Sequence, residues 1–327
     1  MKIKNAAALL CAAVVFFGGC TGKNTAEDAK DAQKKINITA TIFPLYDFAR
    51  QIAGKRANIT MLLPTGAEVH SYEPTPQDIL NIQNSDLFIN VGGAADPWAE
   101  QAAATGKKKV NMLSASDYCN LLCEDEQHHE GHSHKDTEID EHVWTSLKNA
   151  EKIAAQICKS LCALDSENEA FYKENLKSFT DKLAQLDKEF QDAASSAENK
   201  TLVFADRFPF KYFTADYGLS YMAAFPGCSS ESEPSAYTVA SLINKIKEEN
   251  IGVVLYTETS NGALADVICE ETGAKKMLMH SCHTVTKKQL LDGITYTELM
   301  NNNLNTVREA LKAKSTGAAL DIKGISV

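Results

Sequence analysis

Histidine is concentrated in one short stretch of the chain. Five of the eight histidines lie within residues 128–144, which read HHEGHSHKDTEIDEHVW. Imidazole nitrogen is a common ligand of zinc and of neighbouring transition metals, so this density predicts metal binding. Four of the five lie in an acidic, polar run over 124–138 that has no apolar periodicity, and we predict that this run is a His-rich loop.

The fifth histidine, His142, has a different setting. It follows Asp140 and Glu141 and precedes Val143 and Trp144, where ordered structure should begin. We therefore predict that His142 belongs to a fixed site and that the loop gathers metal near it. The stretch contains no zincin motif, because HEGH is one residue short of the H-E-x-x-H spacing that places two imidazoles on one face of a helix.

The other three histidines follow predicted strands. His70 lies in the loop after a strand over 59–63, and His280 and His283 follow the last strand of the chain. In open parallel sheets, ligands bind beyond the carboxyl ends of the strands, where loops present side chains from a stiff scaffold. Each histidine alone is more often a surface or core residue than a ligand, but their shared position at strand ends indicates one site.

Two carboxylates also stand at predicted strand ends. Asp206 and Glu258 both follow strands in the second half of the chain. For Asp206 we favour a salt bridge with Arg207 or a nearby lysine over metal ligation. For Glu258 we favour a role as a hydrogen-bond acceptor that orients a ligating histidine.

The hydrophobic pattern predicts two α/β lobes that would position these side chains. Strands alternate with helices in each half, which predicts parallel-type sheets covered by helices. The N-terminal lobe is predicted over 35–165 and the C-terminal lobe over 198–327. Between them, an apolar stripe from Tyr172 to Phe190 predicts one long rigid helix over 166–197, about 40 Å long and opened by an S-x-x-E capping box.

The composition excludes several classes of function. The chain of 327 residues is long enough for two domains. Its net charge of −10 and its lack of a Lys/Arg cluster argue against nucleic acid binding. It contains neither the G-x-S-x-G motif of a nucleophilic serine nor a phosphate-binding glycine motif.

The first residues predict export. Two lysines precede an apolar run over 6–17 that is short for a membrane span, which is typical of a secretory signal peptide. The run ends in FGGC, which resembles a bacterial lipobox, so we predict a signal peptide over 1–20 and lipidation of Cys20. A polar tether over 21–34 would follow. The protein is therefore expected to be extracytoplasmic, at the cell surface or in the periplasm, and lipid-anchored to the bacterial membrane.

Export changes how the cysteines are interpreted. Seven remain after Cys20, an odd number that cannot all pair within one chain. We favour a disulfide between Cys228 and Cys282, because both fall in loops after predicted strands. This pairing would exclude Cys282 as a metal ligand, since an extracytoplasmic thiolate would be exposed to oxidation.

Two longer motifs resemble a known family. LPTGAEVHSYEPTP over 63–76 is similar to the first metal-ligand motif of the zinc- and manganese-binding lipoproteins that serve ABC metal importers. DEHVW over 140–144 is similar to their second, and zinc-specific members carry a His-rich loop before it. EETGAK over 270–275 and the segment 296–311 resemble the closing segments of the family, so the resemblance spans the mature chain. It implies two α/β lobes joined by one long helix, with metal held between the lobes.

The match is incomplete at two expected ligand positions. The third ligand of the family is usually a histidine or glutamate where this chain has ADRFPF over 205–210, and the fourth is usually an aspartate where it has MHSCH over 279–283. The resemblance therefore implies that the MHSCH segment supplies nitrogen, with Asp206 or Glu258 as an oxygen alternative. Several nitrogens would favour Zn²⁺, whereas more carboxylate would suit Mn²⁺. The predicted metal ligands are His70, His142, His280 and His283.

These observations predict a binding protein and not an enzyme. The leading hypothesis is a lipid-anchored, monomeric receptor that captures zinc in the cleft between the lobes and delivers it to an ABC permease, with only a small tilt between the lobes. One alternative is a surface-anchored zinc buffer or adhesin that binds through the His-rich loop. The other is a zinc hydrolase with a carboxylate base such as Glu258.

Overall fold

The computed structural model describes residues 35–106, 108–123, 139–226 and 234–312, apart from the side chain of His70. Several predicted features lie outside the described residues: the signal peptide with Cys20, the tether over 21–34, the His-rich loop over 124–138, and Cys228.

Two four-stranded parallel sheets share one topology. The strand orders are β2-β1-β3-β4 and β6-β5-β7-β8, so each sheet has its first strand between its second and third. The first sheet consists of β1 (Ile36–Ala40), β2 (Ala57–Met61), β3 (Leu87–Asn90) and β4 (Asn111–Ser114). The second consists of β5 (Thr201–Phe208), β6 (Ser220–Pro226), β7 (Val253–Tyr256) and β8 (Lys275–Leu278). The predicted parallel α/β class is confirmed.

Helices connect the strands within each lobe. The first lobe contains α1 (Phe43–Ala53), α2 (Pro76–Asn84), α3 (Ala99–Ala104) and α4 (Leu147–Leu164). The second contains α6 (Lys211–Tyr217), α7 (Ala236–Glu248), α8 (Ala263–Thr272), α9 (Lys287–Leu291) and α10 (Tyr296–Ala310). Short 3-10 turns lie at η1 (Gly54–Arg56), η2 (Val69–Ser71), η3 (Ala115–Tyr118), η4 (Val143–Thr145) and η5 (Ser166–Asn168). Across the described ranges, no helix has both the length and the apolar character needed to cross a membrane.

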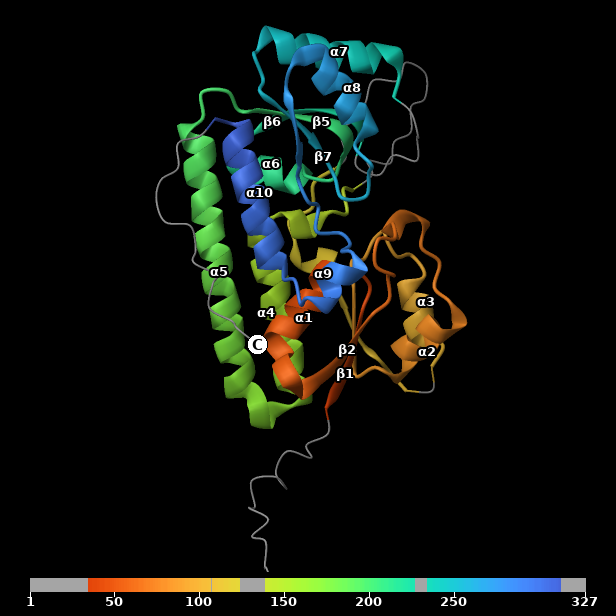
Figure 1. Cartoon of the computed structure of the whole chain (residues 1–327). Helices are drawn as coiled ribbons and strands as arrows, with labels where there is room; N and C mark the ends of the chain where they lie inside the picture. Colours follow the sequence, from red (N-terminus) through yellow and green to blue (C-terminus); the bar gives the residue numbers. More distant parts are fainter. Residues whose placement is uncertain (1–34, 107, 124–138, 227–233, 313–327) are drawn as a thin grey trace, which may run out of the picture. The chain divides into compact units, whose positions relative to one another are not determined.

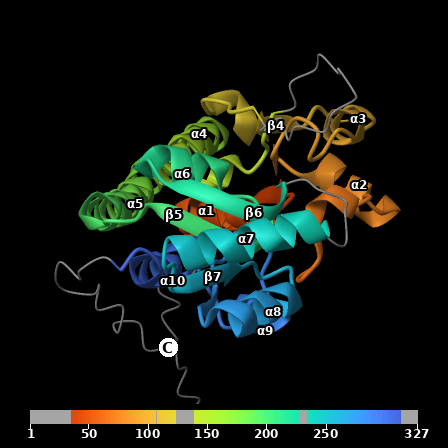
Figure 2. The same ribbon diagram turned by 90° about the horizontal axis from the view of Figure 1, so that it is seen from above.

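Each sheet buries apolar side chains on both faces. On one face of the second sheet, Val203 and Val254 pack with side chains of α7 and α8. On the other face, Phe204 and Leu255 join a larger core that includes α10, α5 and α1, and that core reaches Ile38 in the first sheet. Figure 1 shows α7 and α8 on the opposite side of the second sheet from α6 and α10. Seen from above, α7 runs across β5 and β6 (Figure 2).

The long helix α5 (Glu169–Ser196) links the two lobes. It has 28 residues, about 42 Å at 1.5 Å per residue. It packs against α1 and α4 from the first lobe and against α6 and α10 from the second (Figure 1). Its apolar stripe, including Phe179, Leu183 and Phe190, is buried. Contact of one helix with both lobes agrees with the expected small tilt between them, which stays a prediction.

The start of α5 differs from the predicted capping box. The segment from Ser166 forms a 3-10 turn, and no side chain caps the first residues of the α-helix. Instead Asp165 closes the turn, because its Oδ2 accepts hydrogen bonds from Asn168 Nδ2 at 2.7 Å and from Tyr172 Oη at 2.7 Å. The prediction of a capping box at Ser166 was therefore wrong, since the side chain of the preceding aspartate accepts the hydrogen bonds at the start of this helix.

A buried carboxylate joins α1 to α10. Asp47 is fully buried, and its Oδ2 accepts the backbone N–H of Tyr296 at 2.7 Å. Its Oδ1 accepts Arg50 Nε–H at 2.9 Å. Burial raises the pKa of Asp47, although the charge of Arg50 and the hydrogen bonds oppose this. The contact is a second link between the lobes, independent of α5.

Candidate metal centre

His142 is held in a defined orientation by Asp140. It lies just before η4, and its imidazole is 2% exposed. Asp140 Oδ1 accepts the His142 backbone N–H at 2.8 Å and lies 3.0 Å from ring Nδ1. A carboxylate oxygen can only accept, so Nδ1 carries the proton and the lone pair is on Nε2. Carboxylate–histidine pairs of this kind commonly orient metal ligands.

The electrostatic environment of His142 favours a cation. Burial lowers the pKa of His142, but the hydrogen bond and charge of Asp140, together with the charges of Glu141 and Glu68, raise it by more, so the net shift is upward. The same negative charges that stabilise a protonated imidazole would stabilise a divalent metal ion at Nε2.

His283 meets the first lobe in a similar way. It belongs to the loop after β8 and is 3% exposed. Its Nδ1 lies 3.5 Å from Glu68 Oε1, and its Nε2 accepts the backbone N–H of Val69 at 3.1 Å. The next residue, Thr284, accepts the Gly66 N–H at 2.9 Å. The segment that contains His70 is therefore joined to the loop of His283.

Trp144 connects the two histidines. Its ring centroid lies 5.3 Å from that of His142 and 5.7 Å from that of His283, in both cases with the planes inclined by 61°. Its Nε1–H donates to the carbonyl oxygen of Ser281 at 2.9 Å. The structure thus brings His142 from the first lobe and His283 from the second against the same indole.

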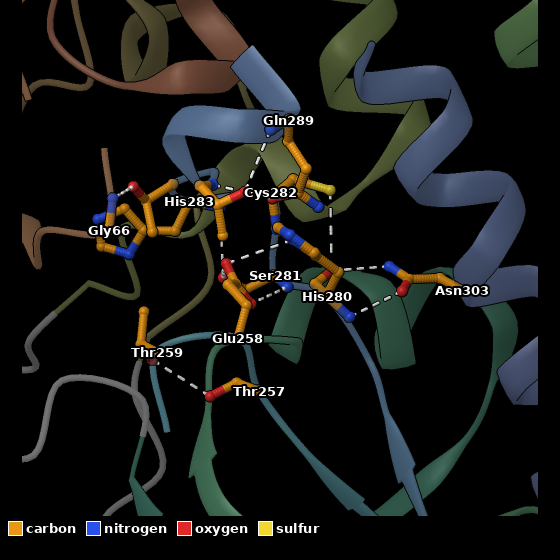
Figure 3. Close-up of polar contacts among 12 residues, drawn as sticks. Gly66, Thr257, Glu258, Thr259, His280, Ser281, Cys282, His283, Gln289 and Asn303 are labelled. Atoms are coloured by element: carbon orange, nitrogen blue, oxygen red, sulfur yellow. Dashed lines mark hydrogen bonds and ion pairs between the residues drawn. The ribbon is translucent and has the colours of Figure 1, made fainter. Parts of the chain in front are cut away.

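His280 is oriented differently. Its Nδ1 accepts the backbone N–H of Cys282 at 3.0 Å, and Glu258 Oε1 lies 3.4 Å from the same nitrogen. The backbone N–H is a permanent donor and makes the shorter contact, so Nδ1 must present its lone pair and a neutral His280 carries its proton on Nε2. Burial lowers the pKa of His280, with Glu258 opposing, which agrees with a neutral ring. In Figure 3, His283 lies toward Gly66 and His280 lies toward Asn303.

The two carboxylates expected at strand ends are engaged in hydrogen bonds, although Asp206 lies inside β5 and only Glu258 follows its strand. Asp206 Oδ2 accepts both the N–H and the Oγ1–H of Thr257, at 2.9 and 2.8 Å, and its Oδ1 accepts the Arg207 N–H at 2.8 Å. Both oxygens of Glu258 accept from Ser281. Ligation by Asp206 would require breaking contacts that join β5 to β7. The expected salt bridge of Asp206 stays a prediction.

Cys282 does not form the expected disulfide. It is a free thiol, fully buried, with Sγ 3.7 Å from the carbonyl oxygen of His280. Burial raises its pKa well above the ordinary value, so the side chain stays a thiol. The pairing with Cys228 failed as a prediction because the Cys282 side chain is directed into the core.

His70 lies in η2, and its side chain is outside the described part of the structure. Among the side chains that the structure does describe, no group of three or more His, Cys, Asp and Glu is close enough to hold a metal ion. The prediction that His70 completes a centre with His142 and His283 therefore stays a prediction.

A family model described as "Zinc-uptake complex component A periplasmic", ZnuA, matches residues 38–310. The chain belongs to this family. The high-affinity zinc uptake system protein ZnuA of Bacillus subtilis strain 168 is 30% identical over 315 residues, which cover 94% of this chain and 97% of that protein. The zinc-binding lipoprotein AdcA of Streptococcus pneumoniae strain R6 is 32% identical over 316 residues, which cover 94% of this chain but 60% of AdcA.

A solved structure supports the ZnuA-family fold. The Zn(II)-bound ZnuA-like domain of Streptococcus pneumoniae AdcA matches with a TM-score of 0.71 and 30% identity, over 85% of this chain and 99% of that one. The predicted family and the two-lobe α/β class are therefore confirmed. The relatives are named for zinc uptake and zinc binding, which speaks against the hydrolase alternative.

Sequence reasoning missed several residues that shape this ZnuA-family centre. Asp140 and Glu68 stand inside the quoted motifs, at two residues from His142 and His70, so their spacing was a usable signal. Asn303, which binds the backbone of His280, gave no local signal because it lies on a helix 23 residues away.

Proposed function

We propose that this protein captures zinc between its two lobes outside the cytoplasm and delivers it to an ABC permease. The observation that carries the proposal is the pair of carboxylate–histidine contacts, Asp140 with His142 and Glu68 with His283, whose two imidazoles both pack against Trp144. In both, Nδ1 faces a carboxylate, so Nε2 carries the lone pair that would bind metal; in His283 this lone pair accepts the Val69 N–H, which the metal would have to displace. Membership of a zinc-uptake family supports the same role.

We propose His70 and His142 from the first lobe and His283 from the second as ligands. The four-histidine set expected from the sequence also included His280. Its Nδ1 accepts the Cys282 N–H, so it could bind metal only after giving up that contact or changing tautomer. His283 Nε2 would likewise have to give up the Val69 N–H, but His283 contacts the first lobe and Trp144, whereas the backbone of His280 is bound to Asn303, so we propose His283 as the ligand.

Zinc fits these donors better than manganese. Imidazole nitrogens suit zinc, whereas manganese favours oxygen-rich sites. The nearby carboxylates of Asp140, Asp206 and Glu258 are engaged by hydrogen bonds from protein groups. They are better placed to orient nitrogen ligands than to supply oxygen to the metal.

Location and anchoring form a separate part of the proposal. The lipobox-like FGGC supports a lipid on Cys20, followed by the tether over 21–34. One relative, AdcA, is named a lipoprotein. The receptor would then act as a monomer held near its permease. Labelling of the protein with a radioactive or alkyne-tagged fatty acid, lost in Cys20→Ala, would test the anchor.

Zinc stoichiometry and affinity in a protein without the His-rich loop test the central claim. Cys123 and Ile139 pair as an antiparallel bridge, so their backbones lie close enough for a short turn centred on Asn-Gly to replace 124–138. We expect one tight zinc by chelator competition, strongly weakened by His142→Ala and by His283→Ala. If the shortened protein binds no tight zinc, the His-rich loop is the site and the zinc-buffer alternative holds.

A further inference from the structure

Glu258 is the main polar anchor of the loop that carries His283. It follows β7 and its side chain is 10% exposed. Its Oε2 accepts the backbone N–H of Ser281 at 2.8 Å, and its Oε1 accepts the Ser281 hydroxyl at 2.7 Å (Figure 3). Both carboxylate oxygens are thus used on a single residue, and hydrogen bonds to an ionised acceptor are about twice as strong as neutral ones.

The serine passes this constraint to His283. Ser281 Oγ donates its proton to Glu258 and accepts the backbone N–H of His283 at 3.3 Å. The direction of the hydroxyl proton is therefore set by the carboxylate, and the lone pair that receives the His283 N–H is set with it. The relay runs from Glu258 to Ser281 to the backbone of His283.

The rest of the loop is arranged so that this relay can act. Asn303 binds the backbone of His280 at both groups, accepting its N–H at 2.7 Å and donating to its carbonyl at 2.7 Å. Cys282 adopts φ +62°, an uncommon value for a residue with a side chain, and its N–H is bound by His280 Nδ1. This turn separates the two histidines, so that His280 stays in the second lobe while His283 faces the first.

We infer that Glu258 is a positioning residue for zinc capture: it acts through Ser281 to hold His283 where its imidazole reaches the first lobe. The inference rests on the proposed function, because it assigns Glu258 a role toward His283 as a ligand. Because each of its oxygens accepts a hydrogen bond from Ser281, Glu258 is better placed to position this loop than to act as a ligand or base. Asn303 fixes the other end of the same loop.

The test compares two isosteric changes in the protein whose 124–138 loop is replaced by the Asn-Gly turn. Glu258→Gln keeps the shape of the side chain, but its amide has one oxygen that accepts and one NH₂ group that donates. It can therefore accept only one of the two hydrogen bonds from Ser281, and we expect zinc affinity to fall about 10- to 100-fold. Glu270→Gln makes the same chemical change at an exposed position on α8, and we expect no change. Ser281→Ala breaks the relay at its centre and should weaken zinc as Glu258→Gln does.

A double-mutant cycle separates positioning from general stability. If Glu258 acts through His283, then Glu258→Gln should weaken zinc no further in a protein that already carries His283→Ala. The ligand-field spectrum of bound Co²⁺ should change in Glu258→Gln and stay unchanged in Glu270→Gln, while the metal-free proteins should share one far-UV spectrum. An equal loss of affinity with and without His283 would overturn the inference in favour of a fold defect.

Different results would contradict the proposed function and the inference about Glu258. If the parent protein binds zinc tightly and His283→Ala weakens it, but Glu258→Gln matches Glu270→Gln, then the inference about Glu258 is refuted and the proposed function stands. If the parent binds no tight zinc, or if His283→Ala leaves it unchanged, then the ligand assignment fails and the role of Glu258 fails with it.

Discussion

Replacing Asp140 by asparagine tests the centre at its best-defined contact. Asp140 Oδ1 accepts two hydrogen bonds from His142, at 2.8 and 3.0 Å, and both side chains are at most 3% exposed. The substituted amide would keep the shape and one carbonyl acceptor but lose the charge. Loss of such a partner usually weakens metal binding about 10- to 100-fold, or roughly 1.4 to 2.7 kcal/mol. Because the contact is buried and charge-assisted, we expect the upper half of that range at pH 8.

The effect should depend on pH with a definite sign. Asp140 is the strongest of the groups that raise the pKa of His142 against the lowering effect of burial. The variant should therefore have a lower His142 pKa, so protons compete with zinc for Nε2 only at more acidic pH. The ratio of parent to variant affinity should shrink as the pH falls from 8 to 5.5.

Chelator competition with the loop-replaced protein measures both quantities. Asp117→Asn is the matched control, because it makes the same change at an exposed residue of η3. Equal affinity of parent and Asp140→Asn at pH 8 would refute the orientation argument. If the ratio of parent to variant zinc affinity stayed constant or grew toward acidic pH, the argument that Asp140 raises the pKa of His142 would be refuted.

Three further outcomes follow from the same contacts. Asp47→Ala should lower the free energy of unfolding by about 3 to 5 kcal/mol in urea titrations, because it leaves buried donors unpaired. The control is Asp181→Ala, which removes an exposed ion pair on a helix and should change the free energy of unfolding by less than about 1 kcal/mol. Equal effects of the two substitutions would contradict the link at α1. Trp144→Phe removes the bond to the Ser281 carbonyl together with part of a buried ring, so stability should fall by at least about 1 to 3 kcal/mol; an unchanged urea midpoint would argue against that bond. Saturating zinc at about 1,000 times Kd should stabilise the loop-replaced protein by roughly 4.1 kcal/mol, seen as a rise in melting temperature that EDTA reverses; a protein that gains nothing from zinc has no interlobe site.

The fold was largely predictable from local pattern. The alternation of buried strands and amphipathic helices predicted both sheets. At the start of α2, Thr75 and Asp78 form a reciprocal cap, with Pro76 in the first turn. The same type of motif was misleading at Ser166, because a capping box competes with any nearby acceptor and Asp165 lies one residue earlier. A sequence pattern indicates which hydrogen bonds can form, and the neighbouring residues determine which of them do form.

The centre was only half predictable for a related reason. Ligating residue types and their strand-end positions are local properties, so His142 and the MHSCH segment could be singled out. Which nitrogen of each imidazole carries a lone pair depends on neighbours from other elements. For His283 these are Glu68 and Val69, more than 200 residues earlier, and for His280 the deciding donor is the N–H of Cys282. The disulfide was mispredicted because the burial of Cys282 is likewise a property of the assembled core.

The bond from the Val69 N–H to His283 Nε2 bears on how firmly cargo is kept. A metal ion at this nitrogen would have to displace the Val69 N–H from the same lone pair. Losing this hydrogen bond would reduce the free energy of metal binding by about 0.5 to 1.5 kcal/mol, which weakens metal affinity roughly two- to twelvefold. The same bond would reform when the metal leaves, so the buried imidazole would keep a partner. The Val69 N–H would thus compete with zinc for His283 and favour its release.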